Sequence, residues 1–134
     1  MHLADNNGRL ILSDHEGHVL AEYVYLPSEP QLESPRPYLL LNTRSGAPVT
    51  AYRPDDHVWH KGLSLALPVV GEHNFWGGPT YIHGQGYVQL SNNGAQVHRG
   101  FLTSSARDAD SIRVDEQLDW IAEDGTLILT EVRT

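Results

Sequence analysis

Turn sequences that favour β-hairpins recur along the whole chain and constrain its fold more than any other feature. Each places glycine after polar residues, between two apolar or alternating runs. Asparagine, aspartate and glycine tolerate the positive φ angles that tight hairpin turns require. The turns are Asn6-Asn7-Gly8, His15-Glu16-Gly17, Arg44-Ser45-Gly46, Asn92-Asn93-Gly94 and Glu123-Asp124-Gly125. Their distribution favours an all-β chain with antiparallel connections.

The runs between these turns alternate with a period of two residues, which is typical of strands with one buried face. Between Ile112 and Trp120 the apolar residues share one face, and Glu116 is the exception. No stretch shows a helical stripe of apolar residues. The predicted strands cover residues 9–13, 19–25, 38–43, 49–52, 63–67, 87–91, 96–102, 111–122 and 126–133. We therefore predict one β domain over residues 1–134, an antiparallel β-sandwich or an open barrel.

Charge and composition narrow the range of partners. The 134 residues carry a net charge of −8, which argues against binding to nucleic acid or to anionic membranes. The absence of cysteine excludes disulfides and thiolate metal sites, so a metal would need histidine and carboxylate ligands. The first ten residues do not resemble a signal peptide, and the longest apolar run, 63–70, is too short to span a bilayer. We expect a cytoplasmic protein without a cofactor.

Histidine and tryptophan concentrate between residues 53 and 101, where glycine also recurs. This segment holds His57, Trp59, His60, His73, Trp76, His83 and His98. Imidazoles can supply proton-transfer groups, and flat indole rings supply contact area for a ligand. The paired glycines Gly77 and Gly78 would let the backbone bend or approach a ligand closely. The pattern predicts a pocket in which these groups converge.

Each of these residues also has a structural interpretation. His57 and His60 could cap backbone groups in a polar loop, Trp76 could fill the core, and His83 could lie in a solvent-exposed turn. The functional interpretation assigns catalysis to His57, His60 and His98, and substrate binding to Asp56, Trp59, Trp76 and His83. It includes no metal ligand.

The order of several motifs resembles the bacterial PmoA-like proteins, a family whose name refers to methane oxygenase. The motifs are Arg36-Pro37-Tyr38, Gly46-x-Pro48-Val49-Thr50, Asp56-His57-x-x-His60-x-Gly62-Leu63, Asn74-Phe75-Trp76-Gly77 and Gly94-x-x-x-His98-x-Gly100-Phe101. The resemblance covers residues 20–133. It implies a β-sandwich related to galactose mutarotases and a role in bacterial sugar catabolism.

Two departures from this family limit what the resemblance implies. The family has adjacent or nearly adjacent histidines where this chain has His57-Val58-Trp59-His60. The family is also considerably longer, so the chain resembles its N-terminal half, and we expect a domain truncated at the C-terminus. In mutarotase-like folds the carboxylate base comes from the later half. The resemblance therefore implies no complete catalytic pair in this chain.

Three functions remain open at this point. The first is a mutarotase- or epimerase-like enzyme that transforms a carbohydrate by histidine acid/base chemistry. The second is a non-catalytic carbohydrate-binding or assembly module, which needs the aromatic rings alone. The third is a cupin-type enzyme with a metal bound by Glu72, His60, His73 and His83. We rank the sugar-related enzyme first, and we expect homo-oligomers to form through the unpaired edge of the terminal strand, residues 126–133.

Overall fold

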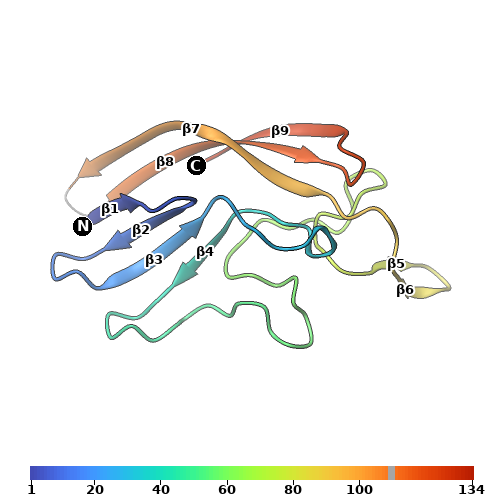
Figure 1. The fold of residues 1–134 in the computed structure, drawn as a ribbon, viewed down its shortest axis with the longest axis horizontal. Coiled ribbons are helices and arrows are strands. Elements are labelled where there is room, and N and C mark those ends of the chain that lie inside the picture. The colour runs from blue at the N-terminus through green and yellow to red at the C-terminus, as the bar shows by residue number, and fades with distance from the viewer. Residues whose placement is uncertain (109–110) are drawn as a thin grey trace.

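The fold consists of two antiparallel β-sheets packed together, with a small hairpin at one end (Figure 1). The computed structural model describes residues 1–108 and 111–134. One sheet contains, in order, β1 (His2–Asp5), β2 (Arg9–Ser13), β3 (Val19–Val24) and β4 (Tyr38–Leu41). The other contains β7 (Ala95–Asp108), β8 (Ser111–Ile121) and β9 (Leu127–Arg133). The predicted all-β antiparallel fold is confirmed.

The remaining regular elements are short. Within the described part of the chain, one 3-10 turn, η1 (Gln31–Glu33), precedes β4, and β5 (Thr80–Ile82) pairs with β6 (Gly86–Val88) in a separate hairpin. Among the residues that the structure describes, no helix has the length and apolar character needed to cross a membrane. The β5–β6 hairpin projects from one end of the two sheets in Figure 1.

The core lies between the two sheets and is built from their alternating apolar residues. Leu10 and Ala21 are buried on the inner face of the first sheet, and Leu118 and Trp120 are buried on β8. This matches the one-sided burial that a period of two dictates. Phe75, which comes from the loop before β5, packs against Trp120 with ring centroids 4.8 Å apart. The loop that carries Phe75 is thereby fixed to the second sheet.

Glu116, the exception in the alternating pattern of β8, is buried together with its apolar neighbours. Tyr23 of the first sheet donates its hydroxyl hydrogen to the Glu116 carboxylate, and His98 Nδ1 lies 2.6 Å from Glu116 Oε1. The His98 ring also packs against Tyr25, at 4.6 Å between centroids. A polar contact between the sheets therefore replaces an apolar one at this position, and it satisfies the buried carboxylate.

Two of the predicted strands are wrong. Residues 49–52 and 63–67 form loops that make only isolated bridges, such as Leu39 with Leu63. The alternating leucines Leu63, Leu65 and Leu67 are exposed, because no layer of the described structure covers that side of the loop. The strands β1 and β5 were not predicted, since segments of four and three residues carry too little pattern.

Candidate functional site

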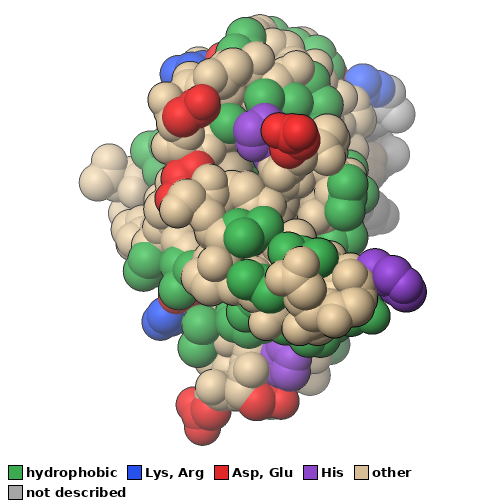
Figure 2. Space-filling model, turned by 90° about the vertical axis from the view of Figure 1, so that its right-hand side faces the viewer, with side chains coloured by type: hydrophobic (Ala, Val, Ile, Leu, Met, Phe, Trp, Pro, Cys, Tyr) green, Lys and Arg blue, Asp and Glu red, His purple; other side chains and the backbone are tan. Residues whose placement is uncertain are grey.

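A cavity of about 650 Å³ lies beside the β5–β6 hairpin, at the end of the molecule that faces the viewer in Figure 2. Hydrophobic side chains cover much of this face, and histidines lie at separate places on it. The cavity is lined by His57, Trp59, His60, Pro68, Val69, Asn74, Trp76, Gly77, Pro79, Thr80, Tyr81 and Tyr87. Its volume falls within the roughly 300–1,000 Å³ that is typical of small-molecule sites.

Four of the residues singled out in the sequence meet at this cavity. The imidazole rings of His57 and His60 are stacked, with centroids 5.1 Å apart. Trp76 meets His60 edge to face at 5.5 Å, and Trp59 meets His57 at 5.3 Å. The loop 57–60 and the loop around Trp76 thus bring imidazole and indole rings together from separate parts of the chain.

The two tryptophans have different environments. Gly77 and Gly78 have positive φ angles of 105° and 67°, and a Cβ atom on either one would lie within 2.7 Å of Trp59. The glycines are therefore needed so that Trp59 can pack against the backbone. Trp76 is 39% exposed and keeps more of its ring free for a ligand.

Some polar groups of the lining already make hydrogen bonds within the protein, and others are free to bind a ligand. The Asn74 side chain accepts hydrogen bonds from the backbone N–H groups of Trp76 and Gly77, and its amide donates to Gly78 and Thr80. Asn74 therefore shapes the loop and has no capacity left for a ligand. Among the described residues, no hydrogen bond engages the indole N–H groups of Trp59 and Trp76 or the hydroxyls of Tyr81 and Tyr87.

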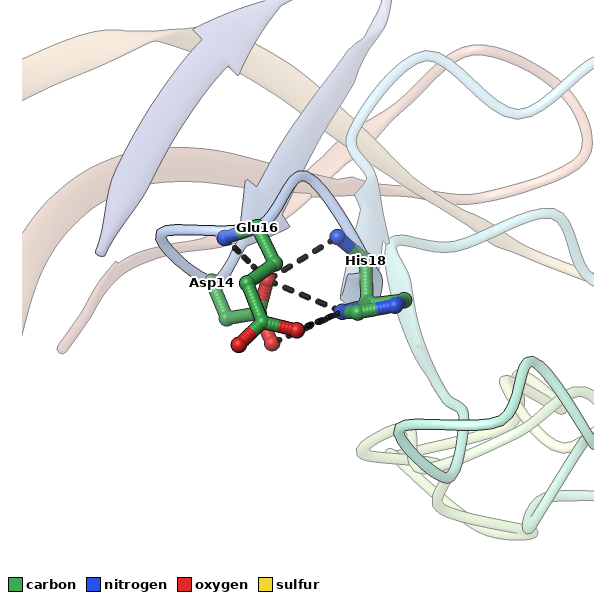
Figure 3. A group of neighbouring side chains, drawn as sticks. All are labelled: Asp14, Glu16 and His18. Carbon is green, nitrogen blue, oxygen red and sulfur yellow. Dashed lines mark hydrogen bonds and ion pairs between the residues drawn. The ribbon is translucent and has the colours of Figure 1, made fainter.

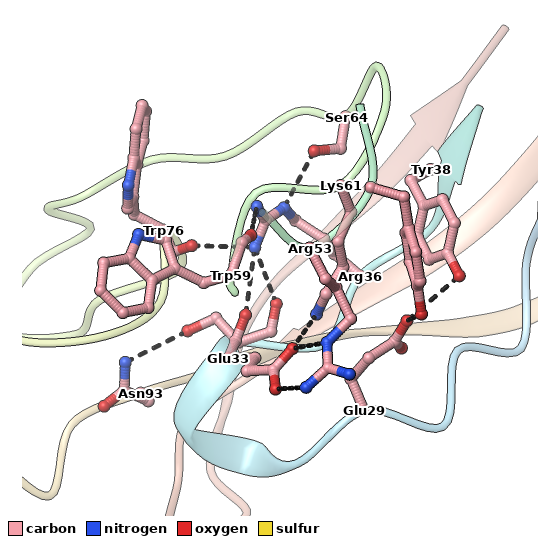
Figure 4. Close-up of polar contacts among 12 residues, drawn as sticks. Glu29, Glu33, Arg36, Tyr38, Arg53, Trp59, Lys61, Ser64, Trp76 and Asn93 are labelled. Atoms are coloured by element: carbon pink, nitrogen blue, oxygen red, sulfur yellow. Dashed lines mark hydrogen bonds and ion pairs between the residues drawn. The ribbon is translucent and has the colours of Figure 1, made fainter. Parts of the chain in front are cut away.

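A buried ionic cluster lies beneath the loop that carries the histidines (Figure 4). Glu33, at the end of η1, is only 3% exposed, and its Oε1 accepts a 2.6 Å hydrogen bond from Arg53 Nη2. Its Oε2 lies 3.1 Å from Lys61 Nζ, and the Lys61 side chain is fully buried. Because Arg53 and Lys61 stand at the two ends of residues 53–61, Glu33 holds both ends of that loop.

Electrostatics in the cluster agree with these contacts. Burial by itself would raise the pKa of Glu33, but the hydrogen bonds from Arg53 and the charge of Lys61 outweigh it and lower that pKa. Burial lowers the pKa of Lys61, and the negative charges of Glu29 and Glu33 oppose this effect. The Lys61 ammonium makes the ion pair without a well-aligned hydrogen bond.

Arg36 connects the cluster to both tryptophans. Its guanidinium is buried and donates hydrogen bonds to the backbone carbonyls of Trp59, at 2.8 Å, and Trp76, at 2.9 Å. Two further bonds go to the carbonyls of Glu33 and Ser34. Burial lowers the pKa of Arg36 to about 10, so it remains charged at neutral pH. One fork-shaped cation therefore holds the two loops that carry the indole rings.

The two histidines of the cavity differ in their surroundings. His57 Nδ1 lies 3.1 Å from Asp56 Oδ2, and this contact lowers the pKa of the Asp56 carboxyl. The pKa of His60 is lowered by burial and by the neighbouring His57 and Arg36. His60 Nε2 is buried and has no hydrogen-bond partner among the described residues. His60 is therefore neutral at physiological pH, while Asp56 orients the ring of His57.

The structure does not bring His98 or His83 into the lining. His98 lies between the two sheets, where it contacts Tyr25 and Glu116. His83 is exposed in the turn that connects β5 to β6. Asp56 is exposed next to the cavity and reaches it only through His57.

Sequence reasoning did not find the tyrosines of the hairpin or the ionic cluster. Tyr81 and Tyr87 flank the Gly84-Gln85-Gly86 turn, and this symmetric placement of two aromatic residues was a usable signal. Arg36 entered the sequence analysis only within the motif Arg36-Pro37-Tyr38, and Glu33 carries no signal, because buried charges cannot be distinguished from surface charges in a single sequence.

A second group of titratable residues lies on the surface, away from the cavity lining (Figure 3). Asp14, Glu16 and His18 offer ligand atoms that lie within 4.8 Å of one another. Arg44 already pairs with both carboxylates, at 2.9 Å from Asp14 Oδ2 and 2.8 Å from Glu16 Oε1. This arrangement is explained as a surface network of ion pairs.

Comparison with known proteins identifies the family but no activity. The chain belongs to the DUF6807 family, a family of unknown function whose sequence profile matches residues 11–134. Searches of curated proteins and of solved structures found no match.

Proposed function

We propose that the cavity binds a neutral carbohydrate. The observation that carries this proposal is the composition of the lining, in which aromatic rings and histidines occur with no Asp, Glu, Lys or Arg side chain. Sugar rings present apolar C–H faces that stack on aromatic rings, and hydroxyls that need hydrogen-bond partners at the edge. The free indole and phenol groups of the lining fit both requirements. The resemblance to PmoA-like proteins points to the same ligand class.

The Asp56–His57 pair favours acid/base chemistry as a second function of the same site. When Asp56 binds Nδ1 of His57, the Nε2 atom of that ring is left for a proton of the substrate. His60, which is neutral and stacked on His57, would orient the substrate or exchange a proton with it. A mutarotase- or epimerase-like reaction needs only such proton transfers. His98 has no part in this proposal because its Nδ1 is engaged by Glu116.

Isothermal titration of the purified chain with glucose, galactose and xylose tests the binding proposal. We expect the Trp76→Ala variant to lose binding, because Trp76 is the more exposed indole of the lining. His15→Ala is a matched control, since His15 is an exposed histidine outside the cavity. Binding that survives Trp76→Ala unchanged would contradict the proposal.

Polarimetry of freshly dissolved sugars separates catalysis from binding. We expect His57→Ala to abolish any acceleration of mutarotation by the wild-type protein, by about 100-fold or more. Asp56→Asn should reduce the rate less, because it affects only the orientation of the ring. If the wild-type protein binds sugars and never accelerates their interconversion, the site is a binding module without acid/base function.

A further inference from the structure

The β5–β6 hairpin places two tyrosines at the mouth of the cavity. Tyr81 and Tyr87 are direct partners in the antiparallel register, and their ring centroids are 5.5 Å apart. They are 62% and 77% exposed, compared with 39% for Trp76 deeper in the same cavity. The aromatic lining therefore continues outward from the histidines to the solvent-exposed edge of the site.

These tyrosines contribute little to the packing of the fold. The β5 and β6 strands pair only with each other among the described strands, and they form a sheet separate from the two main ones. Large exposed aromatic side chains on such an element indicate an interaction site, because burial of their rings does not stabilise the folded chain.

A second loop also contributes apolar surface to the mouth of the cavity. Val69, which is exposed, and Pro68 line the cavity together with the hairpin. The mouth thus offers apolar surface from two loops, and its tyrosine hydroxyls make no hydrogen bond to other described residues. A polyhydroxylated ligand that leaves the cavity would find both stacking surfaces and hydrogen-bonding groups there.

The angle between the tyrosine rings restricts the shape of that ligand. The ring planes are inclined by 68°, so the two rings cannot both lie parallel to one face of a single sugar ring. A ligand that stacks on both must present apolar faces in different orientations. Consecutive rings of an oligosaccharide do so, because each glycosidic linkage rotates one ring relative to the next.

We propose that the site binds the end of an oligosaccharide rather than a free monosaccharide, an inference that rests on the proposed carbohydrate function. The terminal ring occupies the cavity beside Trp76, His57 and His60. The next two rings lie at the mouth, one stacked on Tyr81 and the other on Tyr87. The hairpin then determines the preferred chain length, and Trp76, His57 and His60 determine which terminal ring binds.

Titration calorimetry with a series of chain lengths tests this assignment. The probes are glucose, xylose and galactose and their α-1,4- and β-1,4-linked dimers and tetramers, each added to the intact chain. For at least one series, we expect the tetramer to bind the wild-type protein about fivefold or more tightly than the monomer, from the added stacking. Tyr87→Ala should reduce this ratio to less than about twofold, because it weakens binding of the tetramer far more than binding of the monomer.

Tyr87→Phe is the matched control, because it keeps the stacking ring and removes only the hydroxyl. This variant should retain most of the gain with chain length. Equal affinity of monomers and tetramers for the wild-type protein would overturn the inference and leave the proposed function intact. A Tyr87→Ala variant that weakens monomers and tetramers equally would also overturn it. If none of the sugars binds, both the inference and the proposed function are wrong.

Discussion

Replacement of Glu33 by glutamine should destabilise the protein more than any other change of one charge in the loop region. Glu33 holds Arg53 and Lys61 at the two ends of residues 53–61, the loop that supplies His57 and His60 to the cavity. The glutamine side chain keeps the shape but loses the negative charge. The fully buried ammonium of Lys61 then loses its closest anionic partner.

The size of the effect follows from this burial. Removal of one partner from a buried ion pair typically costs about 3–5 kcal/mol, because the other charge stays desolvated. The negative charge of Glu29 also acts on Lys61 and compensates for part of the loss. We therefore expect a decrease of about 3 kcal/mol in the free energy of unfolding. For a chain of this size this corresponds to a melting temperature lower by roughly 10 °C.

Urea denaturation followed by circular dichroism measures this change by linear extrapolation. Glu22→Gln is the matched control, since Glu22 pairs with Arg9 on the exposed surface at 3.2 Å and should cost less than about 1 kcal/mol. The double variant Glu33→Gln/Lys61→Met should recover much of the loss, because it also removes the buried cation. A Glu33→Gln variant as stable as Glu22→Gln would refute the reasoning.

Three further predictions concern stability. Contacts with Arg53 and Lys61 hold the pKa of Glu33 below its ordinary value of 4.5, against the effect of burial. Wild-type stability should therefore fall as the pH drops below 4.5 towards the pKa of the folded state. The urea midpoint of Glu33→Gln should fall less steeply over the same pH range. Gly94→Ala would place a methyl group against the buried Phe75 ring, and urea unfolding should report a loss of about 1–3 kcal/mol; an unchanged midpoint would contradict this packing. Tyr23→Phe removes a donor to buried Glu116 and should cost about 1–3 kcal/mol in the same assay, whereas a neutral effect would mean that the contact between the sheets is absent in solution.

The long strands could be predicted from the sequence because their alternation reflects one buried face. Residues 111–122 were predicted as a strand, and β8 covers Ser111–Ile121. The same rule failed for Leu63, Leu65 and Leu67, whose alternation is equally regular but whose side chains are exposed in a loop. Periodicity shows which residues share a face, and it does not show whether another layer covers that face.

The candidate site was predictable only in part. The clustering of histidine and tryptophan in the sequence identified His57, His60 and Trp76, because loops that are close together in the sequence can lie side by side in the fold. It also included His98, which pairs with Glu116 between the sheets. That pairing depends on the register of β7 against β8, including the bulge between His98 and Gly100, and a single sequence does not contain such information.

The three tryptophans allow the most direct test of the carbohydrate site. Trp59 and Trp76 line the cavity, whereas Trp120 is buried in the core and its indole N–H donates to Glu131 Oε2 at 2.8 Å. In ¹H–¹⁵N spectra of the protein titrated with the tetrasaccharides, we predict that the indole signals of Trp59 and Trp76 shift and that the Trp120 signal stays in place. Indole signals that remain unchanged with every sugar, or a shift confined to Trp120, would contradict a carbohydrate site in this cavity.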